Sequence, residues 1–147
     1  MTATHTGQTA IVGIGQTEFS KESGRSELQL AAEASLAAIT DAGLTPSDVD
    51  VAQIYEAFTP NGFQMLESFG FCEPGGAKDF VAAGELELDG SLPTNTAGGL
   101  MGEAYIHGYN LITEAVRQVR GTALNQVPDV THSMVTTARS ALILSTD

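Results

Sequence analysis

The chain has 147 residues, the size of one ordinary domain, and that length allows a real hydrophobic core. It carries 6 lysines and arginines against 18 aspartates and glutamates, which gives a formal net charge of −12. Such a charge repels phosphate backbones, so the composition argues against nucleic acid and anionic membranes as partners. Charged residues make up 16% of the chain, too few to predict a disordered protein.

The cysteine content and the terminus indicate a soluble protein of a reducing compartment. Cys72 is the only cysteine, so no internal disulfide can form, and no Cys/His cluster predicts a metal site. Residues 1–7 lack the basic and apolar regions of a signal peptide. No apolar run is long enough for a transmembrane helix. We therefore expect a cytoplasmic protein that binds no metal.

The first fifty residues predict a strand followed by a helix. Residues 10–14 are a short, β-branched run closed by Gly15, which is typical of a buried strand. Ser26 stands three residues before Gln29, the spacing of a capping box, and opens a helix that we predict over residues 26–42. The apolar face of this helix is expected to consist of Leu28, Ala32, Leu36 and Ile39.

The rest of the chain alternates helical and extended patterns, which predicts an α/β protein with helices packed on a mixed sheet. Strands are predicted over residues 49–55, 131–135 and 141–144, with a short edge strand at 85–88. Helices are predicted over residues 61–69, 78–83 and 103–120. The last helix is expected to carry an apolar stripe formed by Tyr105, Tyr109, Ile112, Val116 and Val119.

Two features could carry chemistry, and each also has an ordinary structural explanation. The Gly98-Gly99 pair precedes a predicted helix, whose N-terminal N–H groups would suit an oxyanion or a phosphate. The same pair equally suits a tight turn with close backbone packing. Tyr55 and Tyr105 could act as an acid or a base if their surroundings lower the pKa of the phenol. Otherwise both are core aromatics.

The remaining titratable residues show no catalytic or metal-binding spacing. His107 is two residues past Tyr105 and is expected to project from another side of the predicted helix, and His132 lies in a predicted strand. Cys72 follows two aromatic residues and is better explained as a buried, inert thiol than as a nucleophile. Three aspartates near the end of the first predicted helix fit solvated turns: Asp41, Asp48 and Asp50.

Motifs spread over nearly the whole chain occur in an order that is more specific than any one of them. They are Ala10–Phe19, Ala42–Asp50, Tyr55-Glu56-Ala57-Phe58, Asn95-Thr96-Ala97-Gly98-Gly99, Ala104–Gly108, Val130–Val135 and Ser140–Ser145. Together they resemble the thiolase-like superfamily, in its sterol-carrier or lipid-transfer thiolase branch. The resemblance implies a partial thiolase-like α/β fold.

Two tyrosines separate this chain from true thiolases. Tyr55 stands where a thiolase has asparagine or histidine, and Tyr105 stands where it has its catalytic histidine. This double replacement is similar to the thiolase-like aldolases of steroid side-chain degradation. The similarity implies retro-aldol cleavage of a β-hydroxyacyl-coenzyme A thioester by the two tyrosines, with no bound cofactor. It places the substrate against Asn95, Gly98, Gly99, His107 and His132.

The resemblance also implies partners and a missing stretch. In the family two similar halves each contain a five-stranded sheet. Residues 1–50 resemble the start of the N-terminal half, and residues 51–147 resemble the later part of the C-terminal half. The stretch between them, which carries the nucleophilic cysteine of thiolases, has no counterpart here, so we expect an internally deleted member. The expected partners are a second copy of the chain or a small subunit with an OB-fold and a zinc ribbon.

Three functions follow from these observations. The first is the retro-aldolase, for which Tyr55 and Tyr105 should face one another across a cleft beside Gly98-Gly99. The second is a thiolase-type acyltransferase, which the absent cysteine nucleophile argues against. The third is an inactive fragment or interaction module. We expect the isolated chain to be marginally stable or self-associating, because deleted strands would leave sheet edges and apolar faces open.

Overall fold

The computed structural model describes residues 9–103 and 106–146 of the chain. In this part of the chain, strands form one mixed sheet in the order β1-β4-β3-β2. Its strands are β1 (Ala10–Gln16), β2 (Val51–Ile54), β3 (His132–Thr136) and β4 (Ser140–Ser145). Both β1 and β3 run antiparallel to β4, whereas β2 and β3 are parallel. The expected α/β fold with a mixed sheet is confirmed.

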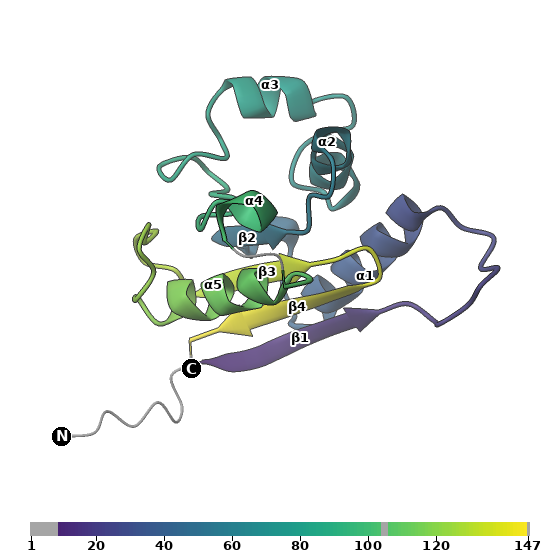
Figure 1. Ribbon diagram of the computed structural model, residues 1–147, viewed down its shortest axis with the longest axis horizontal. Helices are drawn as coiled ribbons and strands as arrows, with labels where there is room; N and C mark the ends of the chain where they lie inside the picture. Colours follow the sequence, from purple (N-terminus) through teal and green to yellow (C-terminus); the bar gives the residue numbers. More distant parts are fainter. Residues whose placement is uncertain (1–8, 104–105, 147) are drawn as a thin grey trace.

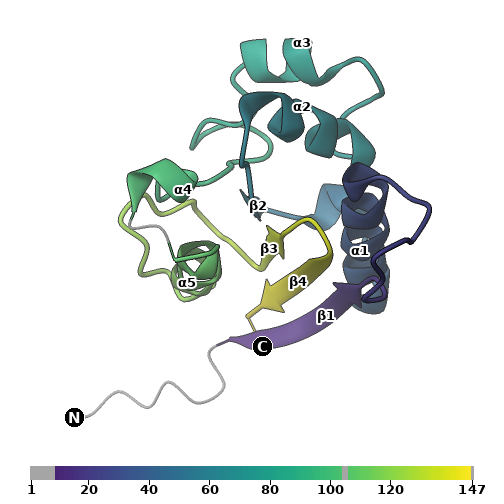
Figure 2. The same cartoon turned by 45° about the vertical axis from the view of Figure 1, so that its right-hand side comes forward.

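Helices cover both faces of this sheet. They are α1 (Glu27–Asp41), α2 (Thr59–Ser68), α3 (Ala77–Ala82), α4 (Gly99–Gly102) and α5 (Tyr109–Val119), with a 3₁₀ turn at Pro46–Asp48. Figure 2 shows the sheet lying between α1 and α5. Figure 1 shows α2 and α3 together beyond the β2 edge of the sheet, with α4 close to the same edge. Three helices, α2, α3 and α4, therefore lie near the β2 edge of the sheet.

Glycine and alanine let α1 approach β1 closely. A Cβ atom added to Gly15 would lie 1.8 Å from the carbonyl oxygen of Ala34, and one added to Gly13 would lie 2.1 Å from that of Ala38. The capping box predicted at the start of α1 is present at Ser26. The predicted apolar face is rotated, because the contact with β1 requires small residues. Leu36 is 42% exposed, and the buried face is Leu30, Ala31, Ala34, Ser35, Ala38 and Ile39.

Strands β2 and β3 are almost completely buried, with side chains packed on both faces of the sheet. Every residue of β2 is buried, with Val51 in the cluster on the α5 side and Ile54 in the cluster on the α1 side. In β3, Met134 packs on the α1 side and Val135 on the α5 side. The burial also encloses polar residues of these strands, namely Gln53, Ser133 and Thr136.

The first and last segments of the chain meet in the sheet. The register of β1 on β4 runs from Ala10 opposite Ser145 to Gln16 opposite Ser140. The strand whose motif resembles the start of the N-terminal thiolase half thus pairs with a strand that resembles the end of the C-terminal half. The two segments therefore share one sheet.

Two predicted elements differ from the structure. Residues 85–88 form turns instead of an edge strand, because Glu85 and Leu86 accept backbone hydrogen bonds from Leu92 and Thr94 and fold the segment back. The helix predicted over 103–120 begins only at Tyr109, since His107 and Gly108 both have positive φ angles, 53° and 81°. Tyr105, predicted in the first turn of that helix, lies outside the described residues.

The apolar stripe predicted for the last helix is also rotated. Tyr109 is 68% exposed, while the polar residues Asn110, Glu114 and Gln118 are buried together with Leu111, Ala115 and Val119. Buried polar contacts around Thr96 account for this orientation. Among the described residues, no helix has the length and apolar character needed to cross a bilayer.

Candidate functional site

Tyr55 and Glu56 follow β2 directly, at the edge of the sheet where several loops meet. The N–H of Tyr55 donates to the carbonyl of Thr136, 3.0 Å away, and so extends the parallel pairing of β2 with β3 by one step. The aromatic ring lies against the residue that precedes α5, because a Cβ atom on Gly108 would be only 3.0 Å from Cδ2 of Tyr55. Glycine at 108 is therefore required both by its positive φ and by this ring.

Asn95 holds the end of β2 as a neighbouring strand would. Its Oδ1 accepts from the N–H of Ile54 at 2.8 Å, and its Nδ2 donates to the carbonyl of Ile54 at 3.1 Å. The same Nδ2 also donates to Oε2 of Glu56 at 2.7 Å. Both polar atoms of its amide are used in these bonds, so Asn95 positions the backbone at the end of β2 and the carboxylate of Glu56.

Glu56 joins this asparagine to the glycine pair. Its Oε1 accepts from the N–H of Leu100 at 3.0 Å. A Cβ atom on Gly99 would lie 2.2 Å from that same oxygen, so the carboxylate reaches the turn only because residue 99 has no side chain. Sequence reasoning did not select Glu56. The available signal was its place beside Tyr55 in the motif that resembles the thiolase Asn-Glu-Ala-Phe motif.

The Gly98-Gly99 pair forms a tight turn into the short helix α4. Gly98 and Gly99 have φ angles of 90° and 62°, which favour glycine. The N–H of Gly98 donates to the carbonyl of Asn95 at 2.7 Å, and the carbonyl of Gly99 accepts from Nδ2 of Asn110 at 3.0 Å. The explanation of these glycines as a tight turn with close backbone packing is therefore confirmed, and the turn lies beside Glu56.

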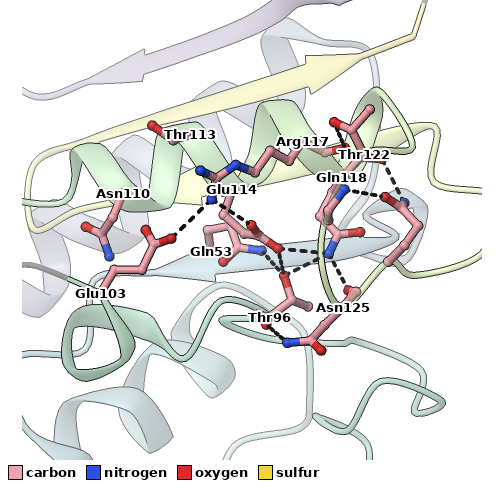
Figure 3. Close-up of polar contacts among 12 residues, drawn as sticks. Gln53, Thr96, Glu103, Asn110, Thr113, Glu114, Arg117, Gln118, Thr122 and Asn125 are labelled. Atoms are coloured by element: carbon pink, nitrogen blue, oxygen red, sulfur yellow. Dashed lines mark hydrogen bonds and ion pairs between the residues drawn. The ribbon is translucent and has the colours of Figure 1, made fainter.

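A buried polar network ties this loop to α5 (Figure 3). Thr96 Oγ1 donates to Glu114 Oε1 at 2.6 Å and accepts from Nε2 of Gln53 at 3.1 Å and of Gln118 at 2.9 Å. The Glu114 side chain is 3% exposed and has Arg117 at 3.7 Å. A polar stripe on α5 is formed by residues four positions apart, Asn110, Glu114 and Gln118. The stripe is visible in the sequence, but polarity alone would predict it on the outer face of the helix.

A cavity of about 740 Å³ opens beside Tyr55, between the end of β2, the α2–α3 pair and α4. That volume is within the usual range of small-molecule sites. Its lining is mostly apolar and consists of Ile54, Tyr55, Glu56, Ala57, Phe58, Thr59, Gly62, Phe63, Leu66, Val81, Leu86, Thr94, Asn95, Leu100 and Met101. The cavity therefore combines one phenol and one carboxylate with a large apolar wall.

The two histidines lie in different parts of the fold. His107 is exposed beside Gly108, the glycine that packs against the ring of Tyr55. His132 begins β3, and its N–H donates to Oδ2 of Asp50 at 2.8 Å. Since β2 and β3 are parallel and Tyr55 meets Thr136 at the other end of β3, His132 lies about four residues, roughly 13 Å, from the tyrosine along the strand.

Cys72 has none of the features of a nucleophile. It is partly buried and packs against the apolar cluster on the α1 side of the sheet. Burial raises the pKa of its thiol, and the nearby carboxylates of Glu67 and Glu73 raise it further. A raised pKa lowers the fraction of reactive thiolate at neutral pH. Among the residues that the structure describes, no group of histidines, cysteines and carboxylates is suited to hold a metal ion.

A sequence profile shows the class of the protein. The chain belongs to the thiolase C-terminal domain-like family, whose profile matches residues 15–145. The steroid side-chain-cleaving aldolase of Thermomonospora curvata is 55% identical over 109 residues, covering 71% of this chain and 28% of that protein. The 17-hydroxy-3-oxo-4-pregnene-20-carboxyl-CoA lyase of Mycobacterium tuberculosis is 56% identical over 94 residues, covering 64% of this chain and 24% of the lyase.

Two solved structures superpose on this chain. The Ltp2–ChsH2(DUF35) aldolase superposes with a TM-score of 0.84 at 44% identity, covering 95% of this chain and 40% of the aldolase chain. A monomeric SCP2-thiolase-like protein of Mycobacterium smegmatis superposes with a TM-score of 0.60 at 21% identity, covering 95% of this chain and 29% of that one, which shows the fold alone. The chain spans about a quarter of the length of the two curated relatives above.

Proposed function

We propose that this chain takes part in retro-aldol cleavage of a β-hydroxyacyl-coenzyme A thioester, with Tyr55 and Tyr105 transferring the protons. The observation that carries the proposal is the position of Tyr55. Its ring lines the apolar cavity and contacts Gly108, which is three residues from Tyr105 in the sequence. The names of two relatives that share more than half of the aligned residues, an aldolase and a carboxyl-CoA lyase, support the same reaction.

The reaction needs one base and one acid, and two phenols can supply both. One tyrosine, as phenolate, takes the proton of the β-hydroxyl group. As the carbonyl forms at Cβ, the Cα–Cβ bond breaks and its electron pair becomes the enolate of the shorter thioester. The other phenol then donates its proton to Cα. The products are a carbonyl compound and a shorter acyl-coenzyme A, so atoms and charge balance without a cofactor. General acid–base catalysis of this kind contributes about 10²- to 10⁴-fold.

The loops around Tyr55 have assigned roles in this proposal. Glu56 and Asn95 hold the glycine turn against the end of β2, and we assign the thioester carbonyl to the side of that turn at Gly98-Gly99. His107, exposed next to Gly108, is assigned to the polar part of the substrate. His132, which motif position assigns to the substrate, lies at the other end of β3 and is not given a role.

The acyltransferase is less well supported than the aldolase. Claisen chemistry of the thiolase type requires a cysteine that forms an acyl-enzyme. Cys72 is the single cysteine of the chain, and its raised pKa and its contacts with the α1-side cluster make it a poor nucleophile. A negative result in the cleavage assay would favour the third function, an inactive fragment or interaction module.

Partners and location are part of the proposal. The solved Ltp2–ChsH2(DUF35) aldolase has, by its name, a second component beside Ltp2. We propose that this chain likewise pairs with a small subunit built from an OB-fold and a zinc ribbon, or with a second copy of itself, in the cytoplasm. The acidic surface, with a net charge of −12, would favour a basic face on such a partner.

The test is a cleavage assay with a matched set of tyrosine variants. The chain, with and without the small subunit, is incubated with a steroid β-hydroxyacyl-coenzyme A, and both products are quantified by chromatography. Tyr55→Phe and Tyr105→Phe should each reduce the rate by about 10²-fold or more. Tyr109→Phe is the control, because Tyr109 is the third tyrosine and its side chain is 68% exposed on α5. Full activity in Tyr55→Phe would refute the assignment.

A further inference from the structure

One face of the sheet is covered only in part. Helix α5 packs on β2, β3 and part of β4. Among the described residues, Figure 2 shows no helix over the same side of β1. Ile11 and Ile14 of β1 are 56% and 57% exposed. They lie on the α5 side of the sheet, because their partners in β4, Leu144 and Leu142, pack in the apolar cluster under α5. Two β-branched side chains therefore remain in contact with water beside that cluster.

Helix α5 borders this uncovered area with an apolar side of its own. Asn110 and Glu114 bond to the loop beyond β2, so the opposite side of the helix, with Ile112 and Val116, is turned toward β4. Both are partly buried and pack against the same cluster as Leu142. The open face is our name for the area formed by Ile11, Ile14, Ile112, Val116 and Leu142.

The outer edge of β1 is closed to a further strand by a carboxylate. The N–H of Thr17 donates to the carbonyl of Arg139 on the β4 side, so the N–H of Ile14 points to the outer edge, as alternation along a strand requires. That N–H donates to Oδ2 of Asp41 at 3.0 Å. Charged side chains on edge strands prevent pairing with another strand. A partner of β1 is therefore expected on the open face and not at the edge.

The open face lies in a part of this acidic chain that has few acidic residues. Strands β1, β3 and β4 contain none, and α5 contains one, Glu114, whose side chain is 3% exposed and accepts from Thr96. The last turn of α5 carries Arg117, and Arg120 follows the helix. The net charge of −12 thus arises mostly elsewhere. Repulsion between two copies of the chain is therefore reduced across this face.

We propose that a second copy of this chain packs on the open face about a two-fold axis, with α5 of each copy over β4 and β1 of the other. A two-fold interface requires one patch that is complementary to itself. The open face meets this requirement because it combines an apolar helix side with an uncovered apolar area of sheet. Pairing removes both from water in each copy. The proposal selects the second copy among the partners named above, and it rests on no step of the cleavage reaction.

Sedimentation equilibrium of the whole chain tests the pairing. At about 100 µM, where an interface of micromolar affinity is nearly saturated, the parent should have the mass of two chains. Ile14→Lys should weaken pairing at least tenfold, because it places a charged group in the apolar contact. Leu36→Lys is the matched control. It makes the same change of charge at a residue that is 42% exposed on α1, across the sheet, and should change the dissociation constant less than twofold.

Cysteine variants locate the contact, and they do so even if Ile14→Lys is unfolded. They are made in a Cys72→Ala background, because Cys72 is the single cysteine of the chain. Thr113 is exposed on α5, so a short bis-maleimide should link Ile14→Cys chains to Thr113→Cys chains in a mixture. Ile14→Cys chains should not be linked to one another, whereas edge-to-edge pairing of β1 would link them. Leu36→Cys mixed with Thr113→Cys is the control and should give no linked pair.

Any of four results overturns the proposal. These are a parent that sediments as one chain at about 100 µM, a folded Ile14→Lys variant that pairs as the parent does, an equal loss of pairing in Leu36→Lys, and linking of Ile14→Cys chains to one another in place of the mixed pair. The cleavage assay is read independently. A dimer without cleavage would leave this proposal standing and remove the aldolase, and cleavage by a single chain would do the reverse.

Discussion

Thr96 is at the centre of the buried polar network between the glycine turn and α5. Within this network, Thr96→Val should destabilise the protein more than any other replacement of a hydroxyl by a methyl group. Valine has nearly the same shape, so the change removes hydrogen bonds and leaves little cavity. Thr96 is 7% exposed, and its hydroxyl donates to Glu114 and accepts from Gln53 and Gln118. The variant leaves a buried carboxylate with one donor fewer and the amide of Gln53 without its acceptor.

The cost follows from these two losses. A hydrogen bond to a charged group contributes about 1.5–3 kcal/mol, and a buried donor left unpaired costs about 1–3 kcal/mol. We therefore expect Thr96→Val to lower the free energy of unfolding by about 3–4 kcal/mol, a large part of the roughly 5–15 kcal/mol typical of a folded domain. With a urea m-value of about 2 kcal/mol/M, the midpoint should fall by about 1.5–2 M.

Urea titration followed by far-ultraviolet circular dichroism measures this, since the chain has no tryptophan. The control is Thr113→Val on the outer face of α5, where Thr113 Oγ1 donates to the carbonyl of Tyr109 in an exposed position (Figure 3). It should change stability by less than about 0.5 kcal/mol. A double-mutant cycle with Glu114→Gln should give a coupling of about 1 kcal/mol or more. Equal losses in Thr96→Val and Thr113→Val, or no coupling, would refute the reasoning.

Two further predictions concern the α1 side of the molecule. Gly15→Ala should destabilise the protein by about 2–4 kcal/mol, the range for overpacking or worse, because the new Cβ would lie 1.8 Å from the carbonyl of Ala34 and α1 must move. Urea titration checks this, and a loss below about 0.5 kcal/mol would contradict the observed packing of α1 on β1. Cys72 should react slowly with iodoacetamide at pH 8, because burial disfavours the thiolate in the folded state. The pH at which its labelling rate is half-maximal should lie above the ordinary thiol pKa of 9.0. Because the pKa of the thiol is raised in the folded state, the protonated thiol contributes stability that is complete below the unfolded-state pKa and is lost as the pH rises through the folded-state pKa. In urea the thiol ionises at a lower pH, so labelling of the unfolded chain should be faster. A folded-state rate equal to that of free cysteine would be inconsistent with the buried thiol.

Strand and helix positions were predictable where a local pattern coincided with the tertiary contacts. The capping box at Ser26, the apolar run before Gly15 and the buried β4 all occur close to where sequence patterns placed them. The strand predicted at residues 85–88 is wrong because alternation of apolar residues cannot distinguish an edge strand from a turn closed by Leu92 and Thr94.

The faces of α1 and α5 were predicted less well than their existence. Apolar periodicity assumes that the buried face is the most apolar one, but α1 buries alanines because β1 presents glycine backbone. In α5 the buried face includes Glu114, whose partner Thr96 comes from another part of the chain and is itself bonded to Gln53 of β2. No local pattern reports that a polar residue will find partners distant in sequence.

The candidate site shows the same division. Tyr55 and the glycine pair were identified by motif position, and the structure places Tyr55 beside Gly108 and Glu56 beside Gly99. The hydrogen bonds that Asn95 and Glu56 make at the end of β2, and the apolar wall that α2 and α3 give the cavity, were not predicted. The approach of Tyr105 to Tyr55 and the division of the chain at about residue 50 stay predictions.

Sequence alone determined the family, the α/β class, the single cysteine and the acidic charge, because these depend on residue identity, local periodicity and the order of motifs. The tertiary structure decided that β1 pairs with β4, which joins the two segments in one sheet, and that a buried polar network anchors the glycine turn to α5. It also decided that an apolar cavity lies between α2, α4 and the end of β2. Each of these depends on groups up to 135 residues apart, such as Ala10 and Ser145, which meet only when the chain has folded.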